Sequence, residues 1–113
     1  MSILVKVKPL SVNRCWQGRR FKTKVYKDYE KELLSELPQL YVKPSGKLEL
    51  RIEVGVSSKL ADLDNISKPF IDILQKRYNF NDNRIYSLKL LKKDVEKGKE
   101  YIQFQFYETP ITH

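Results

Sequence analysis

At 113 residues, with 41% hydrophobic and 12% aromatic side chains, the chain has enough apolar material for one packed domain and too little for two. The chain has 22 Lys and Arg residues and 14 Asp and Glu residues, which gives a formal net charge of +8. This charge favours a polyanionic partner such as nucleic acid, although binding to an anionic membrane surface or a need for solubility would also account for it. A single cysteine, Cys15, excludes an intrachain disulfide, and a single histidine, His113, excludes zinc sites built from Cys and His and any mechanism with a buried histidine base.

The first third of the chain predicts a strand, a basic connection and a helix. Residues 2–8 alternate apolar and mostly polar side chains, and this period of two predicts a half-buried strand. Residues 10–22 form the connection. Over residues 23–37 the period changes to four, which predicts an amphipathic helix with Thr23 as its N-cap and Pro38 as its stop. The expected apolar stripe of this helix includes Val25, Tyr29 and Leu33.

The rest of the chain predicts a second strand, a second helix and two further strands. Residues 48–56 alternate clearly after a turn that contains Pro44 and Gly46. The second helix has an apolar stripe of Ile66, Phe70, Ile73 and Leu74. Its start is left open by Pro69, which fits a first turn capped by Ser67, or else a helix that begins at Asp64 or Asn65 and lacks one hydrogen bond. The last two strands are expected at residues 85–93 and 101–107, with Gly98 at the bend between them.

The order of elements, β-α-β-α-β-β, predicts one domain over residues 1–113. Its class is α+β with two layers, in which a mixed or antiparallel four-stranded sheet carries two helices on one face. No segment approaches the roughly 20 apolar residues of a membrane span. The N-terminal apolar run is interrupted by lysines and has no small-residue cleavage site, so we expect a cytoplasmic protein.

Acidic residues gather around the start of the second helix. Asp62 and Asp64 stand two residues apart just past a strand, and an extended backbone there would point both carboxylates the same way. Lys68 lies four residues beyond Asp64 and returns to the same side on a helix. Asp82 precedes the next strand and could add a third carboxylate where two strand ends meet at the sheet edge.

Carboxylates with one lysine, and without His or Cys, are typical of Mg²⁺-dependent phosphoryl transfer. Hard oxygen ligands suit Mg²⁺, and lysine suits the charge that concentrates on a scissile phosphate. The alternative from the residues alone is that the Asp62 to Asn65 segment only caps a helix, which is the commoner role of such a pair.

The wider pattern favours the metal site. Residues 61–74 read ADLDNISKPFIDIL, and an acidic step follows at Asp82 and Ile85. This D-L-D-N-x-x-K-x-x-x-D-x-L order resembles the signature of RusA-type Holliday junction resolvases, and the opening segment KPLSVNRCW resembles the N-terminal loop of that family. The likeness spans nearly the whole chain in order. One departure is Asn81, because the family usually shows two adjacent acids at this turn.

The resemblance implies a Mg²⁺-dependent endodeoxyribonuclease that works as a homodimer on four-way or branched DNA, with Mn²⁺ as a substitute ion. It implies Asp62, Asp64 and Asp82 as metal ligands and Lys68 as the catalytic cation. The reaction it implies is the resolution of Holliday junctions by paired symmetric nicks in recombination and repair. Asp72 also matches the family pattern and is either a partner of Lys68 or an ordinary helix-surface acid, outside the predicted ligand set.

The basic connection is the predicted DNA-binding segment. Cations interleave there with aromatic and amide groups, and the expected contacts are Asn13, Arg14, Trp16, Arg19, Arg20 and Lys22. For Trp16 alone we favour the alternative that its ring is folded into the core. A second cationic set on the final hairpin either follows the DNA arms or protects a sheet edge: Lys89, Lys92, Lys93, Lys97 and Lys99.

Two other functions stay open at the level of sequence. One is a non-catalytic, basic nucleic-acid-binding module whose Asp-rich turn is structural. The other is a nuclease of flaps or other branches that uses the same residues. Cleavage that depends on Mg²⁺ separates the first from an enzyme, and a competition between substrates separates the second.

Overall fold

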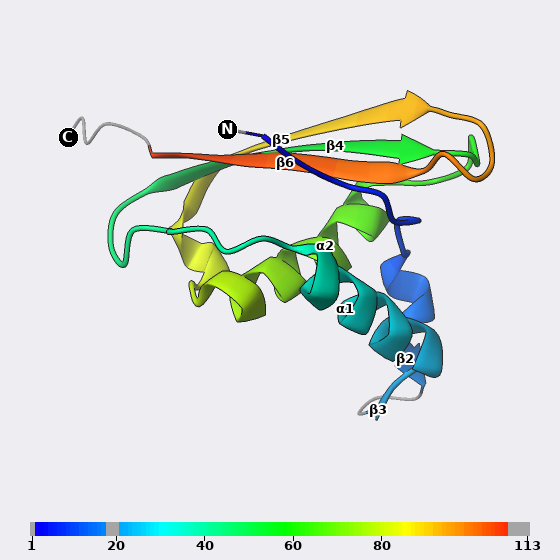
Figure 1. Ribbon diagram of the computed structural model, residues 1–113, viewed down its shortest axis with the longest axis horizontal. Coiled ribbons are helices and arrows are strands. Elements are labelled where there is room, and N and C mark those ends of the chain that lie inside the picture. Colours follow the sequence, from blue (N-terminus) through cyan, green and yellow to red (C-terminus); the bar gives the residue numbers. More distant parts are fainter. Residues whose placement is uncertain (1, 18–20, 109–113) are drawn as a thin grey trace.

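The computed structural model describes residues 2–17 and 21–108, and it confirms the expected α+β fold in two layers. The four-stranded sheet forms one layer, and Figure 1 shows the helices α1 (Lys24–Glu36) and α2 (Leu63–Tyr78) together on one face of it. The sheet order is β1-β6-β4-β5. Its strands are β1 (Ile3–Val5), β4 (Leu48–Val56), β5 (Ile85–Asp94) and β6 (Tyr101–Glu108).

The sheet is mixed because of the way its two central pairings run. β4 lies antiparallel to β6 and parallel to β5, and β1 lies antiparallel to β6. A parallel pair needs a crossover connection, and α2 is that crossover between β4 and β5. The outermost strands of the sheet, within the described residues, are therefore β1 and β5. β1 is shorter than the predicted strand, since it pairs with β6 over three residues only.

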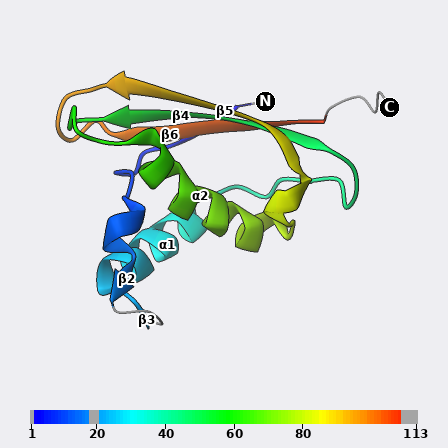
Figure 2. The same ribbon diagram turned by 180° about the vertical axis from the view of Figure 1, so that it is seen from behind.

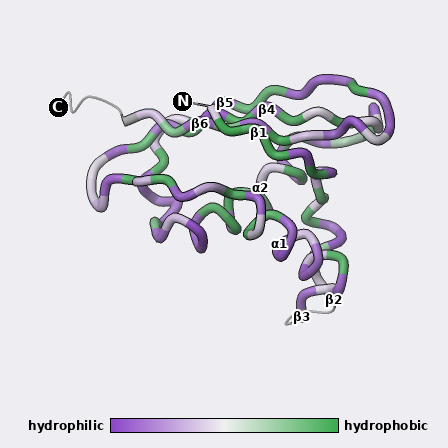
Figure 3. The backbone as a smooth tube through the Cα atoms, viewed as in Figure 1, coloured by the Kyte–Doolittle hydropathy of each residue, from purple (hydrophilic) through white to green (hydrophobic). Residues whose placement is uncertain are grey.

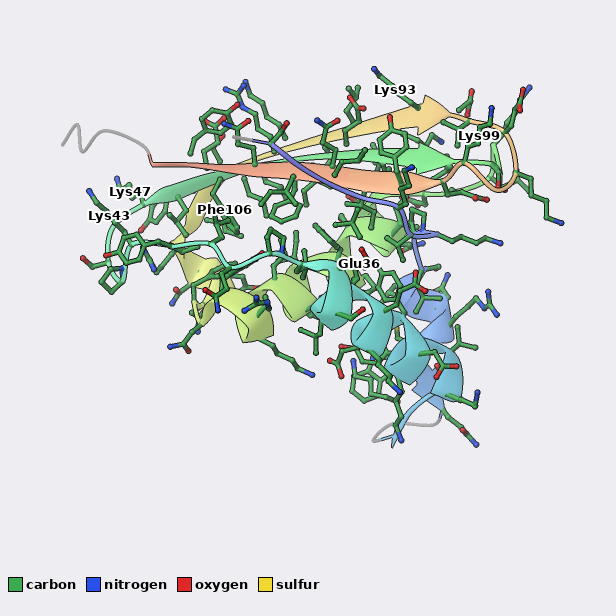
Figure 4. The ribbon with its side chains drawn as sticks, in the orientation of Figure 1. Glu36, Lys43, Lys47, Lys93, Lys99 and Phe106 are labelled. Atoms are coloured by element: carbon green, nitrogen blue, oxygen red, sulfur yellow. The ribbon has the colours of Figure 1, made fainter. Side chains whose placement is uncertain are left out.

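The core lies between the sheet and the helices. Alternate residues of the strands, among them Leu50, Val54 and Ile102, are buried on the helical side. Phe104 of β6 packs edge-on against Phe70 of α2, with ring centroids 5.3 Å apart. Figure 4 shows Phe106 directed toward the helices and Lys93 directed away from them. Removal of this apolar face from water is the main force that holds the two layers together.

The opposite face of the sheet is polar and aromatic, and none of the described elements lies over it (Figure 1). A broad shallow groove on this face is lined by polar side chains such as Arg51 and Gln105 and by apolar ones such as Leu91. Figure 3 shows hydrophilic residues on the helix turns farthest from the sheet, as expected for amphipathic helices that bury one side.

Helix α1 begins and ends where the sequence predicts. The Thr23 side chain accepts a hydrogen bond from the Tyr26 backbone N–H at 3.1 Å, and the helix ends at Glu36 with Leu37 as its C-cap, immediately before Pro38. The expected stripe is confirmed at Tyr29 and Leu33, which are buried. It is wrong at Val25, which is 40% exposed, because the helix is rotated so that Tyr26 enters the core instead.

Helix α2 begins earlier than either predicted start. Asp62 is its N-cap and Leu63 its first residue, so Ser67 is an interior residue and not the cap. Pro69 lies inside the helix, where the carbonyl of Asn65 loses its usual partner. The buried stripe of Ile66, Phe70, Ile73 and Leu74 is confirmed, and its packing on the sheet outweighs the local cost of the proline. No helix of the described chain is long and apolar enough to cross a bilayer.

The predicted basic connection contains short elements that the sequence did not reveal. A 3-10 turn, η1 (Val12–Arg14), leads into a small hairpin of β2 (Trp16–Gln17) and β3 (Phe21–Lys22). A second 3-10 turn, η2 (Asp82–Arg84), joins α2 to β5. Elements of two or three residues are too short to show a hydrophobic period, which is why they were not predicted.

Candidate metal and nucleic-acid site

The start of α2 holds two exposed carboxylates next to each other. Asp62 has an extended backbone, and its Oδ1 accepts a hydrogen bond from the Asp64 N–H at 3.0 Å. Asp64 is already helical, so the expected extended backbone ends at Asp62. Asp62 therefore does cap the helix, and this hydrogen bond holds the Asp62 carboxylate against the backbone of Asp64. The positive end of the helix dipole favours both negative charges at this position.

Lys68 lies on the same side of α2 as Asp64, one turn further along, and its side chain is exposed. Asp72, one turn beyond Lys68, accepts a hydrogen bond from Gln75 Nε2 at 3.3 Å. The ion pairs of the described residues do not include one between Lys68 and Asp72. The surface-acid interpretation of Asp72 therefore fits the structure better than a partnership with Lys68, and Lys68 remains available to a ligand.

Asp82 lies at the other end of the helix. It is the first residue of η2, is exposed, and is held by its backbone N–H, which donates to Gln75 Oε1 at 2.8 Å. Since α2 has 16 residues, a length of about 24 Å separates Asp82 from Asp62. Figures 1 and 2 show the start of α2 near the arrowheads of β4 and β5, and its end near their tails.

The expectation that Asp82 meets the other two carboxylates where two strand ends join is wrong within one chain. Asp62 follows the end of β4, whereas Asp82 precedes the beginning of β5, and the two strands are parallel. Across the part of the chain that is described, no set of three or more His, Cys, Asp or Glu side chains is placed to hold a metal ion. The structure brings Asp62 and Asp64 together and leaves Asp82 apart.

A cation that the sequence did not single out for this site lies beside the start of α2. The Lys92 ammonium donates to the Ala61 carbonyl at 2.9 Å, immediately before Asp62. Asp94, two residues further along β5, lies opposite Val56 at the end of β4. Only the parallel register of β4 and β5 places Lys92 and Asp94 here, so no local signal could have identified them.

The basic hairpin lies at the same end of the molecule as the start of α2 (Figures 1 and 2), and η1 packs against α2. Arg14 and Asn13 are exposed, and the Asn13 N–H is bonded to the Ser11 hydroxyl. Trp16 is 45% exposed, so the favoured core placement of its ring is wrong. The predicted contacts Arg19 and Arg20 lie outside the described residues.

The Trp16 ring lies at the surface, where it packs against a lysine ammonium group and not against the core. The Lys22 ammonium lies 3.9 Å from the centre of the Trp16 ring and 4.2 Å from that of Tyr26. The hairpin pairs Trp16 directly with Lys22, which puts both side chains on one side of it. An aromatic ring and an ammonium group are thus presented together at the surface.

A polar network connects the base of this hairpin to α2. Glu30 of α1 accepts hydrogen bonds from the Tyr26 hydroxyl at 3.1 Å and from the Lys76 ammonium at 2.6 Å. Partial burial works against ionisation of Glu30, but these two bonds outweigh it and lower the pKa of its carboxyl. Cys15 is buried in the core, and this burial raises the pKa of its thiol.

The second cationic set does not form one surface. Lys89 and Lys93 face away from the helices, and Lys92 faces the start of α2. Lys93 lies 3.5 Å from a carboxylate oxygen of Glu53, and Lys99 lies 3.5 Å from one of Glu96. Acidic neighbours therefore offset part of this charge, and only Lys92 adjoins the candidate site.

In comparisons with known proteins, no family model matches this chain, and no curated protein sequence matches it.

Proposed function

We propose that this chain is a Mg²⁺-dependent DNA endonuclease of the RusA type, which resolves Holliday junctions by paired nicks. The observation that carries the proposal is the group of exposed Asp62, Asp64 and Lys68 at the start of α2, at the end of the molecule that also bears the basic hairpin. Carboxylates that suit a hard cation and cations that suit a polyanion thus lie at the same end of the molecule.

The two carboxylates suit Mg²⁺. This ion is usually bound by one or two carboxylates together with waters, so an exposed pair meets its requirement. The cap uses Asp62 Oδ1 alone, which leaves Oδ2 and the Asp64 carboxylate as oxygen donors. Bound Mg²⁺ or Mn²⁺ would supply Lewis-acid activation of the phosphodiester and of the attacking water.

The other residues contribute charge and position. Lys68 would place a compact positive charge by the phosphate, where negative charge develops during cleavage. Arg14 and Lys22 would bind flanking phosphates, and these contacts set the position of the DNA without reading its sequence. The exposed Trp16 ring offers a surface on which a base unstacked at a branch point can lie.

Asp82 can join the other two carboxylates only from a second copy. Asp82 lies about 24 Å from Asp62 in its own chain, far beyond any shared ligation. If Asp82 is a ligand, as the family resemblance implies, each site combines Asp62 and Asp64 of one subunit with Asp82 of its partner. A two-fold dimer then has two identical sites, which matches the two symmetric nicks that a four-way junction requires.

A non-catalytic nucleic-acid-binding module is the second candidate, and one observation favours it. Asp62 has a structural role as the cap of α2, so its presence does not require a metal. Such a module would bind branched or linear nucleic acid through the same basic hairpin but would leave the strands intact.

The proposal is tested by incubation of an end-labelled, immobile four-way junction with the protein in millimolar Mg²⁺ or in EDTA. Linear duplex, single strand and a flapped duplex serve as competitor substrates. The Asp64→Asn variant is compared with Asp28→Asn, in which an exposed acid of α1, outside the predicted ligand set, is neutralised. Paired nicks in the junction that require Mg²⁺ and Asp64 support the proposal. Junction binding without cleavage in Mg²⁺ and in Mn²⁺ contradicts it and favours the binding module.

A further inference from the structure

The loop between β4 and α2 holds an apolar side chain in water. Leu60 is 94% exposed, more than any other large hydrophobic residue that the structure describes, and the next leucine, Leu4, is 54% exposed. Residues 58–61 form a β-turn, in which the Ala61 N–H donates to the Ser58 carbonyl at 3.3 Å. Leucine is not a usual residue in the middle of a turn, where Gly, Asn, Asp and Ser predominate. The turn itself therefore does not account for this leucine.

Hydrogen bonds fix the backbone on both sides of Leu60. The Leu60 N–H donates to the Ser58 hydroxyl at 3.2 Å. The Ala61 carbonyl accepts from the Lys92 ammonium at 2.9 Å, and the next residue, Asp62, caps α2. Leu60 thus projects into water from a turn that is anchored to β5 on one side and to the helix on the other.

The surroundings of Leu60 are charged. Lys59 precedes it, and the exposed Asp62 and Asp64 follow shortly after. Residues 57–62 contain no other large apolar side chain. A protein partner buries an apolar patch of many residues, which this loop does not offer. A single apolar side chain within a charged surface instead suits nucleic acid, which is charged outside and apolar where its base stack opens.

Leu60 is also close to the place where the proposed function puts the scissile phosphate. It precedes Asp62 by two positions, so the Cα atoms of these two residues are at most about 7 Å apart. Successive nucleotides of a duplex strand rise by about 3.4 Å. A phosphate bound at the carboxylates would therefore bring the leucine within a few base steps of the bond to be cut. Linear duplex has a continuous base stack there, whereas a branch point interrupts it.

We infer that Leu60 is an apolar wedge that enters the base stack at a branch point and makes the protein prefer branched to linear DNA. The inference deepens the proposed function and rests on it for the nucleic-acid substrate. Leucine is one of the side chains that proteins insert between base steps, and burial of its apolar surface offsets part of the cost of unstacking. The anchored turn contributes because a wedge that is rigid before binding loses little conformational entropy on insertion.

The wedge and the carboxylates then have separate tasks. Leu60 selects the branch, whereas Asp62 and Asp64 hold the metal ion. The cations of the basic hairpin contact phosphates in any DNA, branched or linear. Truncation of Leu60 should therefore weaken binding to a branch, leave binding to linear duplex unchanged and leave the fold intact, since the side chain is almost wholly in water.

The first test compares affinities for an immobile four-way junction and for linear duplex of the same sequence, in EDTA, where no metal-dependent cleavage interferes. Leu60→Ala should lose at least about 10-fold in junction affinity, because most of a buried leucine side chain is removed, and should bind linear duplex as the wild type does. Leu60→Met, which keeps an apolar side chain of similar size, should retain most of the junction affinity. Leu4→Ala truncates an exposed leucine of β1 and is the matched control. Unchanged junction affinity in Leu60→Ala, or an equal loss for both DNAs, would overturn the inference.

The second test observes the unstacking itself. The fluorescent base 2-aminopurine is placed at the branch point, where its emission rises when it leaves the stack. At saturating protein, the wild type, Leu60→Met and Leu4→Ala should produce this rise and Leu60→Ala should not. Saturation removes differences in affinity, and circular dichroism should show the same melting temperature for Leu60→Ala and the wild type. An equal rise with the wild type and Leu60→Ala would refute the wedge.

These readouts separate the inference from the proposed function. Branch preference and unstacking that depend on Leu60, without cleavage in Mg²⁺ or Mn²⁺, support the wedge and contradict the nuclease. Junction cleavage that Leu60→Ala performs as well as the wild type supports the nuclease and contradicts the wedge. A wild type that binds the junction no better than linear duplex contradicts the wedge, whether or not it cleaves DNA.

Discussion

Asp62 has a visible structural role and a proposed chemical one, and two substitutions separate them. Its Oδ1 caps α2 by accepting the Asp64 N–H at 3.0 Å. Asparagine retains this acceptor and is as good a cap as aspartate, whereas alanine removes it. Asp62→Ala should therefore destabilise the fold by about 1–2 kcal/mol, from the lost cap and the lost favourable interaction with the helix dipole. Asp62→Asn should cost only about 0.5 kcal/mol, from the lost charge.

The assays are thermal unfolding by circular dichroism and nicking of the four-way junction. For a chain of this size, the alanine variant should lower the melting temperature by roughly 4–8 °C and the asparagine variant by about 2 °C. Both variants should lose nicking by more than ~100-fold, since loss of a metal ligand should exceed the effect of losing a supporting residue. The reasoning is refuted if Asp62→Asn cleaves at nearly the wild-type rate, because Asp62 would then be a cap and nothing more.

Three further results are expected. Asp64→Asn should leave the melting temperature and junction affinity nearly unchanged and abolish cleavage, while Asp28→Asn should match the wild type in all three; a large loss of affinity in Asp64→Asn would argue against a ligand role. Junction binding should weaken steeply with salt. Arg14→Ala and Lys22→Ala should each lower the slope of log affinity against log salt concentration by about 1. An unchanged slope in this salt titration would exclude a phosphate contact by the substituted residue. The folded pKa of Glu30 is lowered, so the stabilising contribution of its carboxylate is present above the ordinary pKa of 4.5 and is lost as the pH falls through the folded value. Glu30→Gln should therefore lose less stability on acidification than the wild type. Parallel curves of unfolding free energy against pH for the two proteins would contradict this.

Secondary structure was predictable where a long hydrophobic period exists. The alternation over Leu48–Val56 specifies β4, and the four-residue period with Thr23 and Pro38 specifies α1, because burial of one face dominates the energetics of both. The start of α2 was not predictable to the residue. Pro69 suggested a late start, but packing of the helix on the sheet tolerates a proline inside it.

The residues of the candidate site could be identified from the sequence, but which of them lie close together in the fold could not be predicted. Asp62, Asp64 and Lys68 are local, so helix geometry relates them directly. The place of Asp82 depends on whether β4 and β5 run parallel, a long-range property with no local signature. Lys92 enters the site through the same register. The exposure of Trp16 depends on its pairing with Lys22 in a hairpin too short to recognise.

A shared active site is the central claim, and a mixture of two inactive variants tests it most directly. Asp64→Asn and Asp82→Asn should each fail to nick the junction in Mg²⁺. After joint refolding, half of the dimers should be mixed, and each mixed dimer should have one site with both substitutions and one site with neither. The account predicts that the mixture regains junction nicking, on one strand per dimer, at about a quarter of the wild-type rate per site, since one site in four is intact. If the wild type cleaves but the mixture remains as inactive as its parents, then each site belongs to one chain and the account is contradicted.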